Sequence, residues 1–158
     1  MTDSSILDAE LIEYRQAREF AVNYIGSNFS RAKADIVRRL LRAGYARPLA
    51  EQVAADLAEI DYVSDYRAAK VLLRRHQGRQ AKGNLYLNSL LQQKGIERAA
   101  AEEALSELAP ESERLAELCA SYQADLERKG PIKARRFLYG RGFPNYLIER
   151  EMERIFDA

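Results

Sequence analysis

One phrase occurs three times in the chain, about fifty residues apart. In each copy a Leu precedes a Gly by four positions and a bulky apolar residue follows the Gly, as in 40–45, 91–96 and 138–143. The glycines stand at 44, 95 and 142, so the spacings are 51 and 47 residues. Such a period is typical of tandem helical repeats. Arrays of this kind usually bind along a surface and rarely build a deep catalytic pocket.

Each of these glycines is predicted to be the residue that follows a helix. Gly adopts the left-handed backbone conformation at little cost, and the apolar residue after it packs back on the last helical turn. Apolar residues four apart precede each Gly, and a second helix with its own apolar stripe follows it, for example Leu49, Val53 and Leu57. No run of alternating β-branched residues is present, so no sheet is expected.

The sequence therefore predicts an all-α protein of three tandem three-helix repeats, forming an elongated and curved array. The expected divisions are residues 1–61, which include an N-terminal segment, then 62–109 and 110–158. Asp65 is a candidate N-cap for the first helix of the second repeat. One helix of the third repeat is expected to carry the stripe Leu115, Leu118, Cys119, Tyr122 and Leu126.

Charged residues are arranged in blocks, which the net charge of +1 conceals. No acid occurs between residues 66 and 96, nine acids and two bases occur between 97 and 127, and no acid occurs between 128 and 148. These two basic blocks include the middle helices of the second and third predicted repeats, and the first repeat shows the same pattern more weakly, with Asp35 among its bases. If the repeats stack in register, a basic strip would suit phosphate backbones or an acidic protein groove.

The same charge pattern has a second interpretation, in which acidic and basic helices pair with one another and keep the chain soluble. The charge pattern is compatible with both. A net charge near zero argues against a dedicated, tight DNA-binding protein, because nonspecific affinity for DNA comes from neutralising phosphates.

The sequence contains no phosphate-binding loop, no dinucleotide glycine fingerprint and no metal-ligand spacing, so we expect no cofactor, no metal and no enzymatic activity. His76 is the only His and lies in a basic stretch, where a solvated or capping role is expected. The only Cys, Cys119, lies on an apolar face and is expected to be buried. With no signal peptide, no membrane span and no disulfide, the chain is expected to be cytoplasmic.

Three phrases in order resemble the bacterial RecX family, modulators of the RecA recombinase, over residues 17–156. They are Tyr62–Arg67 (Tyr-Val-Ser-Asp-Tyr-Arg), Leu91–Ile96 (Leu-Gln-Gln-Lys-Gly-Ile) and Arg135–Phe143 (Arg-Arg-Phe-Leu-Tyr-Gly-Arg-Gly-Phe). The sequence departs from the family's Gly-Tyr-Gly-Pro phrase at Ala81–Asn84, where only Gly83 is kept, and has Asn88 and Leu90 where Arg and Glu are usual.

This resemblance implies a protein that binds the RecA–DNA filament and limits its extension or promotes its disassembly, and we expect a monomer without enzymatic activity. It would thereby regulate recombination, DNA repair and the SOS response. The candidate contacts to the filament are electrostatic: Arg38, Arg39, Arg42, Arg74, Arg75, Arg79, Lys82, Lys133, Arg135 and Arg136. The alternative is a helical protein that binds single- or double-stranded DNA independently of RecA, which the helix–turn–helix character of the repeated phrase favours.

Overall fold

Helices account for all the regular secondary structure between residues 2 and 157, the part of the chain that the computed structural model describes. Ten α-helices and one short 3-10 helix follow one another without a strand in this range, which confirms the all-α prediction. The helices divide into two compact units. Unit 1 contains the described residues up to 68 together with 94–97, and unit 2 contains 69–93 together with 98–157. The threefold repeat and its curvature stay predictions.

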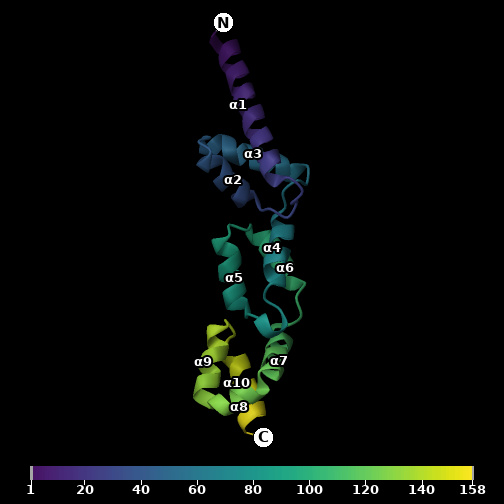
Figure 1. Ribbon diagram of the computed structural model, residues 1–158, viewed down its shortest axis with the longest axis vertical. Helices are drawn as coiled ribbons and strands as arrows, with labels where there is room; N and C mark the ends of the chain where they lie inside the picture. Colours follow the sequence, from purple (N-terminus) through teal and green to yellow (C-terminus); the bar gives the residue numbers. More distant parts are fainter. Residues whose placement is uncertain (1, 158) are drawn as a thin grey trace. The chain divides into compact units, whose positions relative to one another are not determined.

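Unit 1 consists of three helices and the start of a fourth. These are α1 (Thr2–Ile25), α2 (Lys33–Arg42), α3 (Arg47–Glu59) and the first turn of α4 (Asp65–Arg74). The second half of α1 packs on α2 and α3 through its small buried residues, Ala17 and Ala21. The first half of α1 continues beyond these two helices, as Figure 1 shows. The other buried core residues are Ile25, Ile36, Leu40, Ala50, Val53, Ala54, Leu57 and Val63.

Unit 2 contains the rest of α4, the 3-10 helix η1 (Gly78–Gln80) and six further helices. These are α5 (Asn84–Gln93), α6 (Arg98–Ser106), α7 (Glu111–Ser121), α8 (Gln123–Lys129), α9 (Pro131–Gly140) and α10 (Asn145–Phe156). Its main core is formed by α7 to α10 around Phe143, which is fully buried. Cys119 lies in this core, as expected from its place on an apolar stripe.

The single helix predicted around Leu115 and Leu126 is wrong, because the chain leaves the helical conformation at Tyr122. This residue has φ −116° and ψ 18°, and it separates α7 from α8. Its ring packs on Phe137, with 5.3 Å between ring centroids, and its hydroxyl donates a hydrogen bond to the Arg79 carbonyl. Apolar spacing could not reveal the break, because α8 resumes with its apolar residue, Leu126, still four positions after Tyr122.

The repeated phrase ends its helices by the mechanism that the sequence predicts. Gly44, Gly95 and Gly142 have φ values of 99°, 74° and 91°, in the left-handed region. At α2 the Tyr45 N–H donates to the Leu40 carbonyl at 3.1 Å, and the Gly44 N–H donates to the Leu41 carbonyl at 3.0 Å. These two bonds define a Schellman motif, which explains why a fixed distance separates the Leu from the Gly.

Asp65 has a different role from the predicted N-cap. The side chain of Ser64 caps α4 by accepting the Arg67 N–H at 3.2 Å, and Asp65 is the first residue of that helix. The buried Asp65 carboxylate accepts the N–H groups of Lys33 at 2.9 Å and of Glu97 at 2.8 Å. Asp65 therefore holds both the start of α2 and the segment 94–97 in unit 1.

Candidate binding surfaces

The first group of predicted contact residues lies on α2. Arg38 and Arg42 are exposed, and no ion pair among residues 2–157 engages either of them. Arg39 is half-buried, and its guanidinium lies 5.1 Å from the Phe20 ring centroid and 5.5 Å from that of Tyr24. Cation–π contacts of this kind hold the charge at the surface while the stem is buried. Arg38 and Arg42 are thus the exposed cations here, and Arg39 is anchored.

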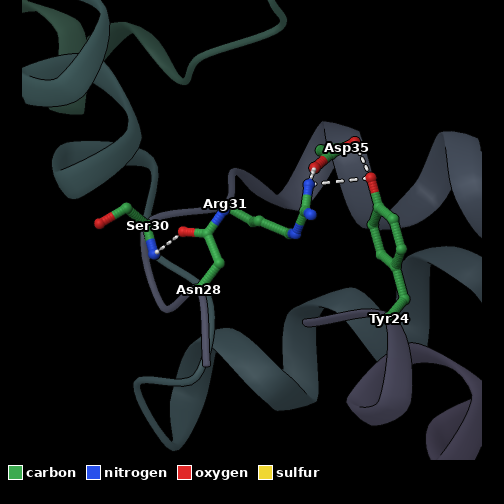
Figure 2. A network of polar contacts seen from close by, with 5 residues as sticks. All are labelled: Tyr24, Asn28, Ser30, Arg31 and Asp35. Atoms are coloured by element: carbon green, nitrogen blue, oxygen red, sulfur yellow. Dashed lines mark hydrogen bonds and ion pairs between the residues drawn. The ribbon is translucent and has the colours of Figure 1, made fainter. Parts of the chain in front are cut away.

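A polar network fixes the aromatic ring on which Arg39 rests. Tyr24 donates its hydroxyl hydrogen to Asp35 at 3.0 Å, and Arg31 Nη1 donates to Asp35 at 2.8 Å and to the Tyr24 hydroxyl at 2.9 Å (Figure 2). Burial, and then the hydrogen bond to Asp35, raise the pKa of Tyr24. Arg31 and Asp35 therefore pair with each other and fix the Tyr24 ring, so Arg31 serves the local structure of unit 1, although its buried Nε has no hydrogen-bond partner there.

The second group lies in unit 2, and its members are engaged to different degrees. Arg74 and Arg75 are exposed on the last turn of α4 and just beyond it. Arg79 donates to the Ser121 carbonyl at 3.0 Å and lies over the Tyr122 ring at 4.3 Å. Lys82 Nζ is 4.8 Å from the Tyr86 ring centroid. Arg79 is accordingly held against α7, whereas the side chains of Arg74 and Arg75 are exposed to solvent.

Two residues that were not among the predicted contacts, His76 and Arg141, join this region. Arg141 donates from Nη1 to the carbonyls of Arg79 at 3.0 Å and Ala81 at 3.2 Å. The His76 ring meets the Tyr86 ring edge to face at 5.5 Å. The structure thus gathers a set of residues that we call the Lys82 cluster: Arg75, His76, Lys82, Tyr86 and Arg141.

The electrostatics of the Lys82 cluster favour an anion. Burial first, then the charges of Lys82, Arg75 and Arg141, lower the pKa of His76. Burial and the charge of Arg141 also lower the pKa of Lys82. No ion pair within residues 2–157 involves a cation of this cluster. Like charges without a carboxylate partner leave a positive potential that a phosphate or carboxylate would relieve.

Two glycines allow the cluster's chain segments to cross so closely. The Gly83 N–H donates to the Arg141 carbonyl at 2.8 Å, and a Cβ on Gly83 would lie 2.1 Å from the Gly142 carbonyl oxygen. A Cβ on Gly142 would lie 2.5 Å from the Tyr86 Cβ. The start of α5 and the turn after α9 are therefore in direct backbone contact. Arg141 could not be assigned to this cluster from the sequence, because this long-range crossing, and not charge density, brings it to Lys82.

The third predicted group, on α9, is partly neutralised. Arg135 makes a bidentate pair with Glu149, at 2.7 Å from Nε and 3.1 Å from Nη2. This hydrogen bonding raises the pKa of Arg135 and lowers that of Glu149. Lys133 and Arg136 are exposed, and the ion pairs of the described residues include neither of them. Lys133 and Arg136 are therefore better placed than Arg135 to meet a partner.

No group of three or more His, Cys, Asp or Glu side chains within residues 2–157 is placed to hold a metal ion. Within the same range, every helix is too short or too polar to cross a bilayer. Burial raises the pKa of the Cys119 thiol to about 12, so the thiol is held neutral in the core.

The structure defines an all-helical protein with exposed, unpaired cations on each of its two units, and this fold is found among solved proteins. A crystal structure of RecX from Lactobacillus salivarius matches with a TM-score of 0.72 and 22% identity, over 94% of this chain and 99% of that one. A crystal structure of a regulatory protein RecX matches with a TM-score of 0.77 and 22% identity, over 95% and 76% of the two chains. No family model and no curated protein matches the sequence. The chain thus has the RecX fold, which confirms the resemblance seen in the three sequence phrases.

Proposed function

We propose that this protein is a RecX-type regulator that binds the RecA–DNA filament and limits its extension or promotes its disassembly. The observation that carries the proposal is the match of nearly the whole chain to two RecX structures, at TM-scores of 0.72 and 0.77. Conservation of the fold at 22% identity over this length supports a shared mode of action. In this proposal the protein regulates recombination, DNA repair and the SOS response in the cytoplasm, by binding and without catalysis.

The contacts in this proposal are exposed cations that no carboxylate of the described chain neutralises. Arg38 and Arg42 come first in unit 1, Arg74 and Arg75 come first in unit 2, and the half-buried Lys82 follows them. Arg39 and Arg79 are held by aromatic rings and would contribute charge at fixed positions. Lys133 and Arg136 complete the set, whereas Arg135 would first have to give up Glu149.

The test is RecA's hydrolysis of ATP on single-stranded DNA, with RecA from the same organism, titrated with this protein. We expect the rate to fall at well below one copy per RecA, because a regulator of filament ends or dynamics acts substoichiometrically. An unchanged rate at molar excess, with the helical circular dichroism intact, would retire the proposal.

The contact surface is tested by reversing the charge of Arg74, Arg75 and Arg79 together. We expect weaker inhibition and a shallower dependence on salt, because each lost cation removes one electrostatic contact. Arg47, Arg98 and Arg154, which are each paired with a neighbouring Glu, provide a control with the same change in charge. Equal inhibition by both triple variants would exclude Arg74, Arg75 and Arg79 as the contact.

The Lys82 cluster favours one alternative, direct binding of DNA without RecA. Unpaired cations beside the exposed Tyr86 ring combine the two elements of single-strand binding, a positive path and a stacking surface. Titration of labelled single- and double-stranded oligonucleotides across salt, without RecA, separates the two functions. Tight binding with a steep salt dependence, and no effect on ATP hydrolysis, would favour the alternative.

A further inference from the structure

The first half of α1 carries an acidic face around one exposed isoleucine. Asp3, Ile6, Glu10 and Glu13 are spaced by three, four and three residues, which places them along one side of the helix. Ile6 is 54% exposed, the three carboxylates are exposed, and no ion pair of residues 2–157 includes them. The side chains of α1 that pack on the unit 1 core begin at Tyr14, and Ala9, Ile12 and Glu13 line an open pocket with the turn after α2. This face is therefore apolar at its centre, negative at its edges and unpartnered.

The corner between α8 and α9 carries the opposite arrangement. Ile132, the most exposed of the large apolar side chains in the described residues at 73%, lies in a groove with Lys129, Lys133 and Arg136. Gly130 and Pro131 complete the groove. Within residues 2–157 these three cations form no ion pair, and Lys129 only lies over the Phe137 ring at 5.0 Å. We call this surface the Ile132 groove.

The two surfaces have opposite charge, and each surrounds one exposed isoleucine. Carboxylates stand three residues before and four residues after Ile6, at Asp3 and Glu10. Cations flank Ile132 at Arg136 on α9 and at Lys129, the last residue of α8, which Gly130 separates from α9. Each surface has one further charge of its own sign, Glu13 or Lys133. Juxtaposing the two would bury both isoleucines and bring opposite charges together at the rim, the arrangement typical of a specific interface.

We propose that the acidic face of α1 in one copy of this chain docks in the Ile132 groove of a second copy. Pairing of α1 with α1 is disfavoured, because residues 2–14 contain four acids and no base. The contact joins two different surfaces, so one such contact leaves a face free on one copy and a groove free on the other. Copies would therefore associate head to tail, and the mean mass would rise with concentration.

The experiment is sedimentation equilibrium of the whole chain without RecA or DNA, from about 1 μM to about 500 μM. The monomer has a mass of 18.0 kDa, and we expect a mean mass that increases with concentration and falls with added salt. Glu10→Lys with Glu13→Lys gives a copy with both surfaces positive, and Lys133→Glu with Arg136→Glu gives a copy with both negative. For each variant alone, the association constant is expected to fall at least about tenfold, which corresponds to about 1.4 kcal/mol of association free energy.

The decisive test is whether an equimolar mixture of the two variants associates. Each positive surface then finds a negative one on the other variant, so association is expected to return to about the wild-type level. Glu102→Lys with Glu103→Lys on α6 is the matched control, with the same charge change at exposed sites, and is expected to associate like the wild type. A constant mass of 18.0 kDa for the wild type overturns the proposal, as does a mixture that stays monomeric. Neither result bears on the effect on RecA.

Discussion

Single residues decide where distant segments of this chain meet, and Asp65 and Gly83 are the clearest cases. The Asp65 carboxylate accepts two backbone N–H groups from segments 32 residues away on either side. Gly83 lies against the backbone of Gly142 at a distance that leaves no room for a methyl group. Neither role follows from local sequence, because both partners are remote along the chain.

Replacement of Asp65 by Asn is expected to lower the free energy of unfolding by about 2–3 kcal/mol. The change removes the charge from two charge-assisted hydrogen bonds and leaves a buried N–H without an acceptor. Urea denaturation measures the loss. Asp61→Asn is the control, since Asp61 is exposed and pairs with Arg67 at the surface, and it should cost less than about 1 kcal/mol. Similar losses for both variants would contradict the role assigned to Asp65.

Replacement of Gly83 by Ala is expected to cost about 1–3 kcal/mol, toward the upper end, because the methyl group would meet backbone atoms that cannot rotate away. Gly140→Ala is the matched control. No atom lies within 4 Å of a Cβ at Gly140, and Gly140 is helical, so its replacement should stabilise α9 by about 0.5–1 kcal/mol. Denaturation midpoints that fail to move in opposite directions would refute the crossing of α5 and the α9–α10 turn.

Cys119 is expected to resist thiol reagents in the folded protein. Burial raises its pKa to about 12 from an ordinary value of 9.0, so the native thiol stays protonated where the unfolded thiol ionises. A raised pKa contributes stability that is fully present below about pH 9 and is lost as the pH rises toward 12. Native labelling at pH 8 should therefore follow the rate of unfolding. Labelling as fast as that of the urea-unfolded chain would show that the thiol is accessible.

At the scale of elements, α1 has two halves with different surroundings. Residues from Tyr14 onward pack on α2 and α3, whereas Ile6, Leu7, Leu11 and Ile12 are exposed. A helical stretch of about 12 residues without tertiary packing is marginal in water. The first half of α1 is thus held by continuity with the packed half, and its apolar residues are available to a partner.

Hydrogen exchange of α1 amides is expected to depend on protein concentration. In dilute solution the amides of residues 5–12 should exchange far faster than those of 18–25, since only the latter belong to the packed half of the helix. At concentrations where copies associate, protection should rise in 5–12 and near Ile132. Protection of 5–12 equal to that of 18–25 in dilute solution would contradict the difference between the two halves.

At the scale of the whole molecule, residues 2–157 include two separate core clusters. One core contains Leu40 and Leu57 in unit 1, and the other contains Leu138 and Phe143 in unit 2, with no residue in common. The chain passes between the units within α4 and again on both sides of 94–97. A substitution in one core should consequently destabilise the unit that contains it before the other unit.

Leu57→Ala and Leu138→Ala are each expected to cost about 2–5 kcal/mol, because both leucines are fully buried. Leu57→Ala should accelerate hydrogen exchange mainly in α2 and α3, and Leu138→Ala mainly in α7 to α10. Mass spectrometry of peptic fragments measures the rate of hydrogen exchange in each of these two regions separately. Uniform acceleration over the whole chain in both variants would mean that the two cores unfold as one.

Local sequence determined most of the helices, their C-terminal glycine turns and the faces that are buried, because helical periodicity and the left-handed conformation of Gly act within a few residues. It also marked every exposed cation that the proposed function uses, and the resemblance in three phrases agrees with the RecX fold. Tertiary structure alone decided the break at Tyr122, the bridging role of Asp65, and which cations are already paired, as Arg135 is with Glu149. The crossing of Gly83 and Gly142 likewise brought Arg141 to Lys82, since contacts between remote segments depend on packing that no local pattern encodes.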